Sequence, residues 1–159
     1  MAIFVKIDGI SGNVSAKGHE GAIAVHSMQH TFQQDISMPV GRPQDRLRAK
    51  PTFSEVILTK SMDDATNSLL NSAYAGKVIP EVQCEVIATG ATLSPIAKYV
   101  FKNVLISQYE TTAGAEGEPI ETIALHFTKM ETTYAGRDPQ NTMSSPKVTG
   151  YNLETADVM

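Results

Sequence analysis

The sequence has few cysteines, no excess of positive charge and no long apolar run, which are the features that disulfide-bonded, nucleic-acid-binding and membrane-spanning proteins depend on. It contains one cysteine, Cys84, so no internal disulfide can form. The formal net charge of −4 provides no positive field for nucleic acid or anionic membrane. The apolar run at residues 2–5 is followed by Lys6 and Asp8, and no run is long enough to cross a bilayer. We therefore expect no nucleic-acid partner, no membrane insertion and no Sec signal peptide.

Motifs for catalysis and metal binding are also scarce. The sequence contains no Gly-x-Gly-x-x-Gly fingerprint, no Walker phosphate loop and no Gly-x-Ser-x-Gly elbow. His26 and His30 have the H-x3-H spacing that joins two ligands on a helix, but along a strand it separates them by about 13 Å. The adjacent acids Asp63 and Asp64 suit a helix start. We expect no enzyme activity, no cofactor and no metal.

Residues 53–88 organise the chain as a strand, one helix and a second strand. Residues 53–59 are rich in β-branched and aromatic side chains and predict a strand. Ser61 and Asp64 resemble a capping box, which predicts a helix from about Met62 to Ala75, ended by Gly76. Helical spacing places one apolar stripe along it, made of Met62, Ala65, Leu69 and Ala73, with Leu70 and Tyr74 beside it.

The second strand of this unit alternates between apolar and polar residues. Val82, Cys84 and Val86 alternate with polar neighbours, as on a half-buried strand. Cys84 is therefore expected to be a small buried hydrophobe, and the alternative is a functional thiol. With 159 residues and 42% hydrophobic content, the chain can bury the core of one domain, which we assign to residues 1–159.

An extended segment from Ala22 to Gln34 has two different faces. Ser27, Gln29, Thr31 and Gln33 alternate with Met28, His30 and Phe32. The first face is polar but uncharged. It is either an ordinary solvent-exposed surface or a lining that contacts cargo.

A long loop follows, at about residues 36–52, because four prolines and glycines interrupt any regular pattern. Within an otherwise acidic chain it concentrates positive charge against one acid, Asp45; the basic residues are Arg42, Arg46, Arg48 and Lys50. A compact domain seldom keeps such a loop without a use, so we expect a role in binding a partner. The alternative is a solvated loop.

The second half of the chain predicts further strands. Residues 99–107 form a strand with apolar residues on both faces, as in a barrel wall packed against a neighbour. A hairpin loop at 113–119 leads to a strand with Ile123, Leu125 and Phe127 on its inner face, and a last strand at 148–153 lies within a polar tail at about 136–159. Many short strands and one helix indicate a mainly β protein, a barrel or a sandwich.

The order of several short motifs resembles the haemolysin-coregulated protein (Hcp) family over nearly the whole chain. The opening IFVKIDGISG at 3–12 and KGHEG at 17–21 carry the resemblance first. The strand at 53–60, MDDAT at 62–66 and AGK at 75–77 continue it. Later elements agree, namely Tyr99, 104–107, 119–121, 125–127, Tyr134 and GYNL at 150–153.

This resemblance implies a structural protein of the bacterial type VI secretion system. Hcp subunits form homohexameric rings that stack into the inner tube, and some rings carry effectors in their lumen. The implied fold is a two-sheet β-barrel with one helix, like phage tail-tube proteins. The implied partners are other copies of the chain, the spike and sheath proteins, and effectors. A cytoplasmic subunit would then leave the cell through the apparatus, without a signal peptide.

In such a ring, Ser27, Gln29 and Thr31 are expected to line the lumen, and the four basic loop residues to contact another subunit. Two alternatives remain. The chain could be a secreted effector or binding module that uses the same fold, although the roughly 25 residues after Tyr134 are too few for a toxin domain. It could also be a prophage tail-tube subunit.

Overall fold

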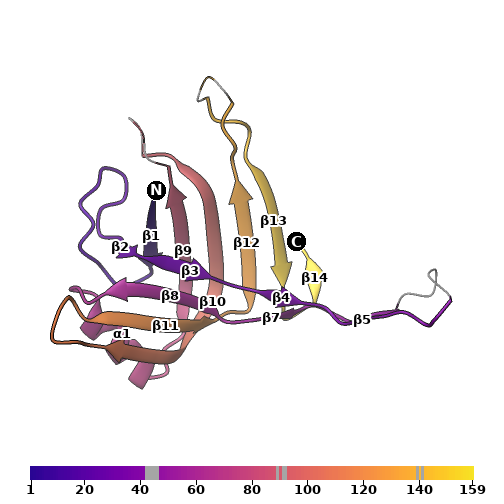
Figure 1. The fold of residues 1–159 in the computed structure, drawn as a ribbon, viewed down its shortest axis with the longest axis horizontal. Helices are drawn as coiled ribbons and strands as arrows, with labels where there is room; N and C mark the ends of the chain where they lie inside the picture. Colours follow the sequence, from indigo (N-terminus) through magenta and orange to yellow (C-terminus); the bar gives the residue numbers. More distant parts are fainter. Residues whose placement is uncertain (42–46, 89, 91–92, 139, 141) are drawn as a thin grey trace.

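The computed structural model describes residues 1–41, 47–88, 90, 93–138, 140 and 142–159, with only the backbone for Leu47 and Arg48. In these residues the chain forms fourteen β-strands and one short α-helix (Figure 1). The expected mainly β class is confirmed. No helix of the described chain is long and apolar enough to cross a membrane.

Ten of these strands form two antiparallel sheets that share one long strand, β10 (Pro95–Thr112). The first sheet has the order β2–β1–β9–β10–β12–β13–β14. Its other strands are β1 (Ala2–Ile7), β2 (Ile23–Val25), β9 (Ile79–Ile87), β12 (Lys129–Tyr134), β13 (Lys147–Asn152) and β14 (Asp157–Val158). The second sheet has the order β10–β11–β8–β3, with β11 (Ile120–His126), β8 (Val56–Ser61) and β3 (Ser27–Gln29).

The two sheets meet at two corners. At the first corner β10 turns at Asn103, which has a φ of 52° that asparagine tolerates better than most residues. At the second corner β2 pairs with β1 of the first sheet and β3 pairs with β8 of the second, and His26 lies between them. A single crossing chain joins the sheets there, so the expected two-sheet barrel is open at this corner.

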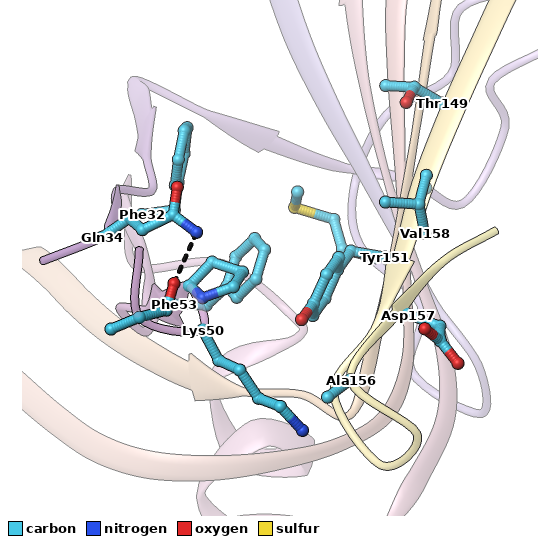
Figure 2. A pocket seen from close by; sticks show the side chains of 13 residues that line it. Phe32, Gln34, Lys50, Phe53, Thr149, Tyr151, Ala156, Asp157 and Val158 are labelled. Carbon is cyan, nitrogen blue, oxygen red and sulfur yellow. Dashed lines mark hydrogen bonds between the residues drawn. The ribbon is translucent and has the colours of Figure 1, made fainter. Parts of the chain in front are cut away.

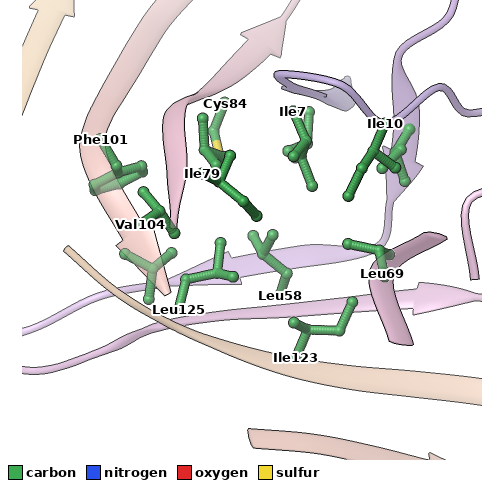
Figure 3. Close-up of a cluster of buried hydrophobic side chains, with 14 of the residues drawn as sticks. Ile7, Ile10, Leu58, Leu69, Ile79, Cys84, Phe101, Val104, Ile123 and Leu125 are labelled. Carbon is green, nitrogen blue, oxygen red and sulfur yellow. The ribbon is translucent and has the colours of Figure 1, made fainter. Parts of the chain in front are cut away.

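The core lies between the two sheets. Phe101 and Val104 of β10 meet Leu58, Ile123 and Leu125 of the second sheet, all of them buried (Figure 3). Phe127 is buried as well, which confirms the predicted inner face after the 113–119 hairpin. Cys84 is fully buried, as predicted, and burial raises the pKa of its thiol to about 12. A thiol that stays protonated is a poor nucleophile, so the alternative of a functional thiol loses its basis.

The helix begins later than predicted. It runs over Thr66–Tyr74 (α1), whereas we expected Met62 to Ala75. Ser61 belongs to β8 and pairs with Ile120, and its Oγ bonds His26 Nε2 at 2.9 Å, so the predicted capping box is wrong. Asp63 Oδ1 instead accepts the N–H of Ala65 at 3.0 Å. Pairing with Ile120 in the strand is therefore favoured over a helix cap at Ser61.

The buried stripe of α1 is narrower than predicted. Ala65 and Leu69 are buried, and Leu69 points toward Leu58 and Ile123 (Figure 3). Met62 precedes the helix and is 46% exposed, and Tyr74 is 81% exposed. Met62, expected at one end of the apolar stripe, and Tyr74, expected beside the stripe, therefore lie outside the core.

The predicted loop at 36–52 is part of a two-stranded arm, which we define as residues 32–53. β4 (Phe32–Gln33) pairs with β7 (Thr52–Phe53), and β5 (Ile36–Ser37) pairs with β6 (Leu47–Arg48). The arm projects away from both sheets (Figure 1, right). Backbone pairing requires no side-chain alternation, so the sequence pattern missed these ladders. Phe53 also lies outside β8, so the predicted strand at 53–59 starts only at Val56.

Candidate assembly surfaces

The second sheet presents a nearly uncharged outer face. In one row across the strands, Ser27 lies opposite Thr59, Thr59 opposite Thr122, and Thr122 opposite Glu110. In the next row Gln29 lies opposite Ile57, Ile57 opposite Ala124, and Ala124 opposite Gln108. The row between them, which points inward, consists of Met28, Leu58, Ile123 and Tyr109.

Two of the three residues predicted to line a lumen share this face. Ser27 and Gln29 are exposed on β3. Thr31 is also exposed, but it lies beyond β3 at the base of the arm, where its N–H donates to Ser54 Oγ at 2.8 Å. The segment from Ala22 to Gln34 is therefore not an unbroken strand, and the structure does not place Thr31 in the sheet.

The predicted second face of this segment, made of Met28, His30 and Phe32, is confirmed for Met28 and His30. Met28 packs against the core, and the ring of His30 lies 5.6 Å from that of Tyr99. Phe32 is 61% exposed because the chain has already left the sheet. His26 and His30 contact different elements, so they do not come together as a metal pair.

Sequence reasoning missed the other members of the outer face. Thr59, Thr122, Gln108 and Glu110 come from three different strands. The signal that could have found Thr59 and Thr122 is the period-two alternation of residues 56–61 and 120–126. Every second residue of these two segments, starting at 57 and at 120, points outward and is uncharged. What the sequence did not reveal is the register that brings these strands side by side.

The second sheet has two free edges at opposite ends. On one side it ends at β3, which pairs with β8. On the other side β10 continues from Leu105 to Thr112 with β11 as its partner among the described residues. Apart from Ile106 and Tyr109, every residue of this stretch is exposed. A long unpaired strand edge is a template for pairing with another chain.

The predicted basic contact site lies on the arm, only partly within the described residues. Arg42 and Arg46 fall outside them, and of Arg48 only the backbone is described, paired with Ile36 in the arm. Lys50 is exposed at the arm's base. The described part of the arm also carries exposed apolar side chains at Ile36, Met38 and Val40.

A cleft of about 560 Å³ separates the base of the arm from the C-terminal strands (Figure 2). Phe53 of the arm and Tyr151 of β13 both line it, and their rings are in contact, with centroids 4.9 Å apart. Lys50 and Asp157 lie at its rim. Its walls are about one hundred residues apart in the sequence, so no local pattern predicts it.

A buried ionic cluster lies beneath the second sheet. Lys60 of β8 and Glu121 of β11 are directly opposite in the register and are 1% and 0% exposed. Lys60 Nζ donates to Glu121 Oε2 and to the carbonyl oxygen of Ser61 at 2.8 Å, and it lies 2.9 Å from Asp63 Oδ1. The hydroxyl of Tyr109 donates to Glu121 Oε1.

The charged state of Glu121 depends on these partners. Burial raises the pKa of this carboxyl, but the hydrogen bonds from Lys60 and Tyr109 outweigh burial and hold the pKa below its ordinary value. Burial, together with the bond to Glu121, raises the pKa of the Tyr109 phenol. The cluster is therefore an ionised pair with a neutral phenol as donor.

A family model and several solved structures match this chain, and all of them come from the type VI secretion system. A family model described as type VI secretion system effector, Hcp, matches residues 4–134. A solved structure of a type six secretion system protein superposes with a TM-score of 0.92 at 22% identity, covering 99% of each chain. Hcp1 from Salmonella typhimurium has a TM-score of 0.80 at 22% identity, covering 99% of this chain and 98% of that one.

A type VI secretion system effector from Yersinia pestis has a TM-score of 0.72 at 23% identity, covering 94% of this chain and 98% of that one. No curated protein sequence matches significantly. At these identities the structural likeness shows the fold, and the family model covers most of the chain independently of it.

Proposed function

The chain belongs to the Hcp family of the type VI secretion system, and from this premise we propose that it is a structural subunit of the secretion tube. Copies would assemble into hexameric rings, and the rings would stack. The role is mechanical, and the proposal assigns no catalytic step to any residue.

The observation that carries this proposal is the second sheet, with two free edges and one nearly uncharged outer face. If the β10 edge of one copy pairs with the β3 edge of the next, the contact uses two different surfaces and can repeat around a ring. Each pairing removes two exposed strand edges, which are otherwise a risk for aggregation. Closure of the ring would leave no edge of this sheet unpaired.

In this ring the outer face of the second sheet would surround the lumen. Ser27 and Gln29 would lie on the wall, and Thr31 at the mouth where the arm begins. Small uncharged polar groups can hydrogen-bond to cargo of varied composition without strong electrostatic attraction. Effectors would be the cargo, and the ring would be exported with them.

The arm would make further contacts between subunits. Arg42, Arg46, Arg48 and Lys50 would meet acidic groups of a neighbouring subunit or of the next ring, since the rest of the chain is acidic. Spike and sheath proteins would be the further partners of the stacked tube. The subunit would be cytoplasmic before assembly and would leave through the apparatus without a signal peptide.

The oligomeric state tests the proposal first. We expect native mass spectrometry and light scattering of the purified protein to give a mass of six chains at micromolar concentration. A strictly monomeric protein under these conditions would refute the ring.

Selective labelling tests the lumen. A Gln29→Cys variant in a Cys84→Ser background should react readily with a small thiol reagent and slowly with one too bulky to enter the ring. The same variant dissociated into monomers is the control, and both reagents should label it rapidly. Rapid labelling by both reagents in intact rings would place Gln29 outside the lumen.

A further inference from the structure

The free edge of β10 contains an irregularity that decides which side chains point inward. The register between β10 and β11 shifts between Ile106 and Gln108, so Ser107 is an extra residue in this strand. The Ser107 hydroxyl donates to the carbonyl oxygen of Ala124 at 3.1 Å. After this bulge Tyr109 points inward and Gln108 and Glu110 point outward.

Tyr109 is the one residue of Ser107–Thr112 that is not exposed. Its hydroxyl donates to Glu121 Oε1, and Glu121 is itself fixed by Lys60. Lys60 uses its remaining donors on Ser61 and Asp63. The partner of Tyr109 is thus a buried carboxylate with no freedom to move.

Apolar packing alone would hold this edge poorly. A strand paired on one side, with most of its side chains in solvent, can slip by one residue, and a one-residue slip turns every side chain to the other face. A slip here would carry Tyr109 to the outer face and bring Gln108 or Glu110 against the core. Glu121 would then lose its phenol donor, and an unsatisfied buried charge is costly.

We infer that Tyr109 is a positioning residue for assembly: through Glu121 and Lys60 it fixes the register of the β10 edge, so that this edge can pair with a second copy of the chain. The inference rests on the proposed ring, and it assigns the polar cluster a role in assembly beyond folding. If the cluster had only a structural role, a substitution in it would lower the stability of the fold without changing the register of the β10 edge.

The test is Tyr109→Phe, which removes one hydroxyl and keeps the ring. The matched control is Tyr99→Phe, the same change in the half of β10 that is paired on both sides; among the described residues the Tyr99 hydroxyl makes no hydrogen bond. Val5→Ala serves as a second control, because Val5 is buried on β1, a strand that pairs with β2 and β9 and not with β10. Each variant is measured for the protein concentration at half-assembly and for amide hydrogen exchange of residues 107–112 in the dissociated monomer.

We expect Tyr109→Phe to raise the half-assembly concentration at least tenfold and to speed exchange across residues 107–112. Both controls should stay within twofold of the parent in half-assembly concentration. An unchanged value for Tyr109→Phe, or an equal rise in Val5→Ala, would overturn the inference. If the parent forms no ring at all, the proposed function fails, whereas unchanged exchange in the Tyr109→Phe monomer refutes the positioning role by itself.

Discussion

Breaking the buried pair between Lys60 and Glu121 should destabilise the fold strongly. In Lys60→Met the carboxylate of Glu121 stays in a site that is 0% exposed, with the hydroxyls of Tyr109 and Thr66 as its remaining donors and no positive charge beside it. Removing one partner of a buried ion pair costs about 3–5 kcal/mol. For a chain of this length, about 2–4 °C of melting temperature is lost per kcal/mol. The melting temperature should therefore fall by about 6–20 °C.

Replacing both partners should cost much less than the sum of the two single changes. In Lys60→Met/Glu121→Leu no charge remains buried, and replacing a buried pair by apolar side chains of similar volume is often neutral or stabilising. The hydroxyl of Tyr109 would lose its acceptor, at a cost of about 1–3 kcal/mol. We expect a coupling energy of at least about 2 kcal/mol between the two positions.

Urea unfolding at fixed protein concentration measures this cycle, since assembly would otherwise contribute to the apparent stability. Lys98→Met is the matched control. Lys98 is 35% exposed and its Nζ lies 3.6 Å from Glu85, so its loss should cost less than about 1 kcal/mol. If Lys60→Met is as stable as Lys98→Met, or if the single changes simply add, the two charges do not form the buried pair described above.

Three further outcomes follow from the same structure. Leu69→Ala should cost about 2–5 kcal/mol of unfolding free energy, while exposed Asn71→Ala should cost little; equal melting temperatures for parent and Leu69→Ala would place the buried helix face elsewhere. Changing all three arginines within residues 42–48 to Glu should weaken ring and tube formation, and undiminished assembly would mean that the arm is merely solvated. The pKa of the Glu121 carboxyl is lowered in the folded protein, so its ionisation stabilises the fold above the ordinary pKa of 4.5, and this stabilisation is lost as the pH falls through the lowered pKa. Urea midpoints measured from pH 7 to pH 3 should therefore fall at the acid end, and they should change less in Glu121→Gln.

Local patterns were sufficient to predict most strands and their inward faces. The buried positions of Cys84, Ile123 and Leu125 follow from alternation, because a strand with one covered face repeats every two residues. The existence of the helix and the burial of Leu69 follow from helical spacing in the same way. These features depend on residues close together in the sequence.

The wrong predictions arose where distant segments compete with local signals. Ser61 looked like a helix cap, but pairing with Ile120 keeps it in the strand. Thr31 continued the alternation of Ser27 and Gln29, yet hydrogen bonds between Ser54 and its backbone hold it at the base of the arm, outside the sheet. The arm's ladders and the cleft likewise depend on pairings that no single segment encodes.

The buried charges also explain why the outer face of the second sheet, apart from Glu110 on β10, can remain uncharged. Lys60 and Glu121 occupy inward positions on adjacent strands and lie directly opposite each other. If β8 or β11 slipped by one residue, one charge would move to the outer face and the other would stay buried without its partner. That penalty exceeds what an apolar pair would impose, because apolar side chains tolerate a new neighbour and an isolated buried charge does not. The charged pair thus secures the register of β8 against β11, and with it the uncharged outer side of these two strands.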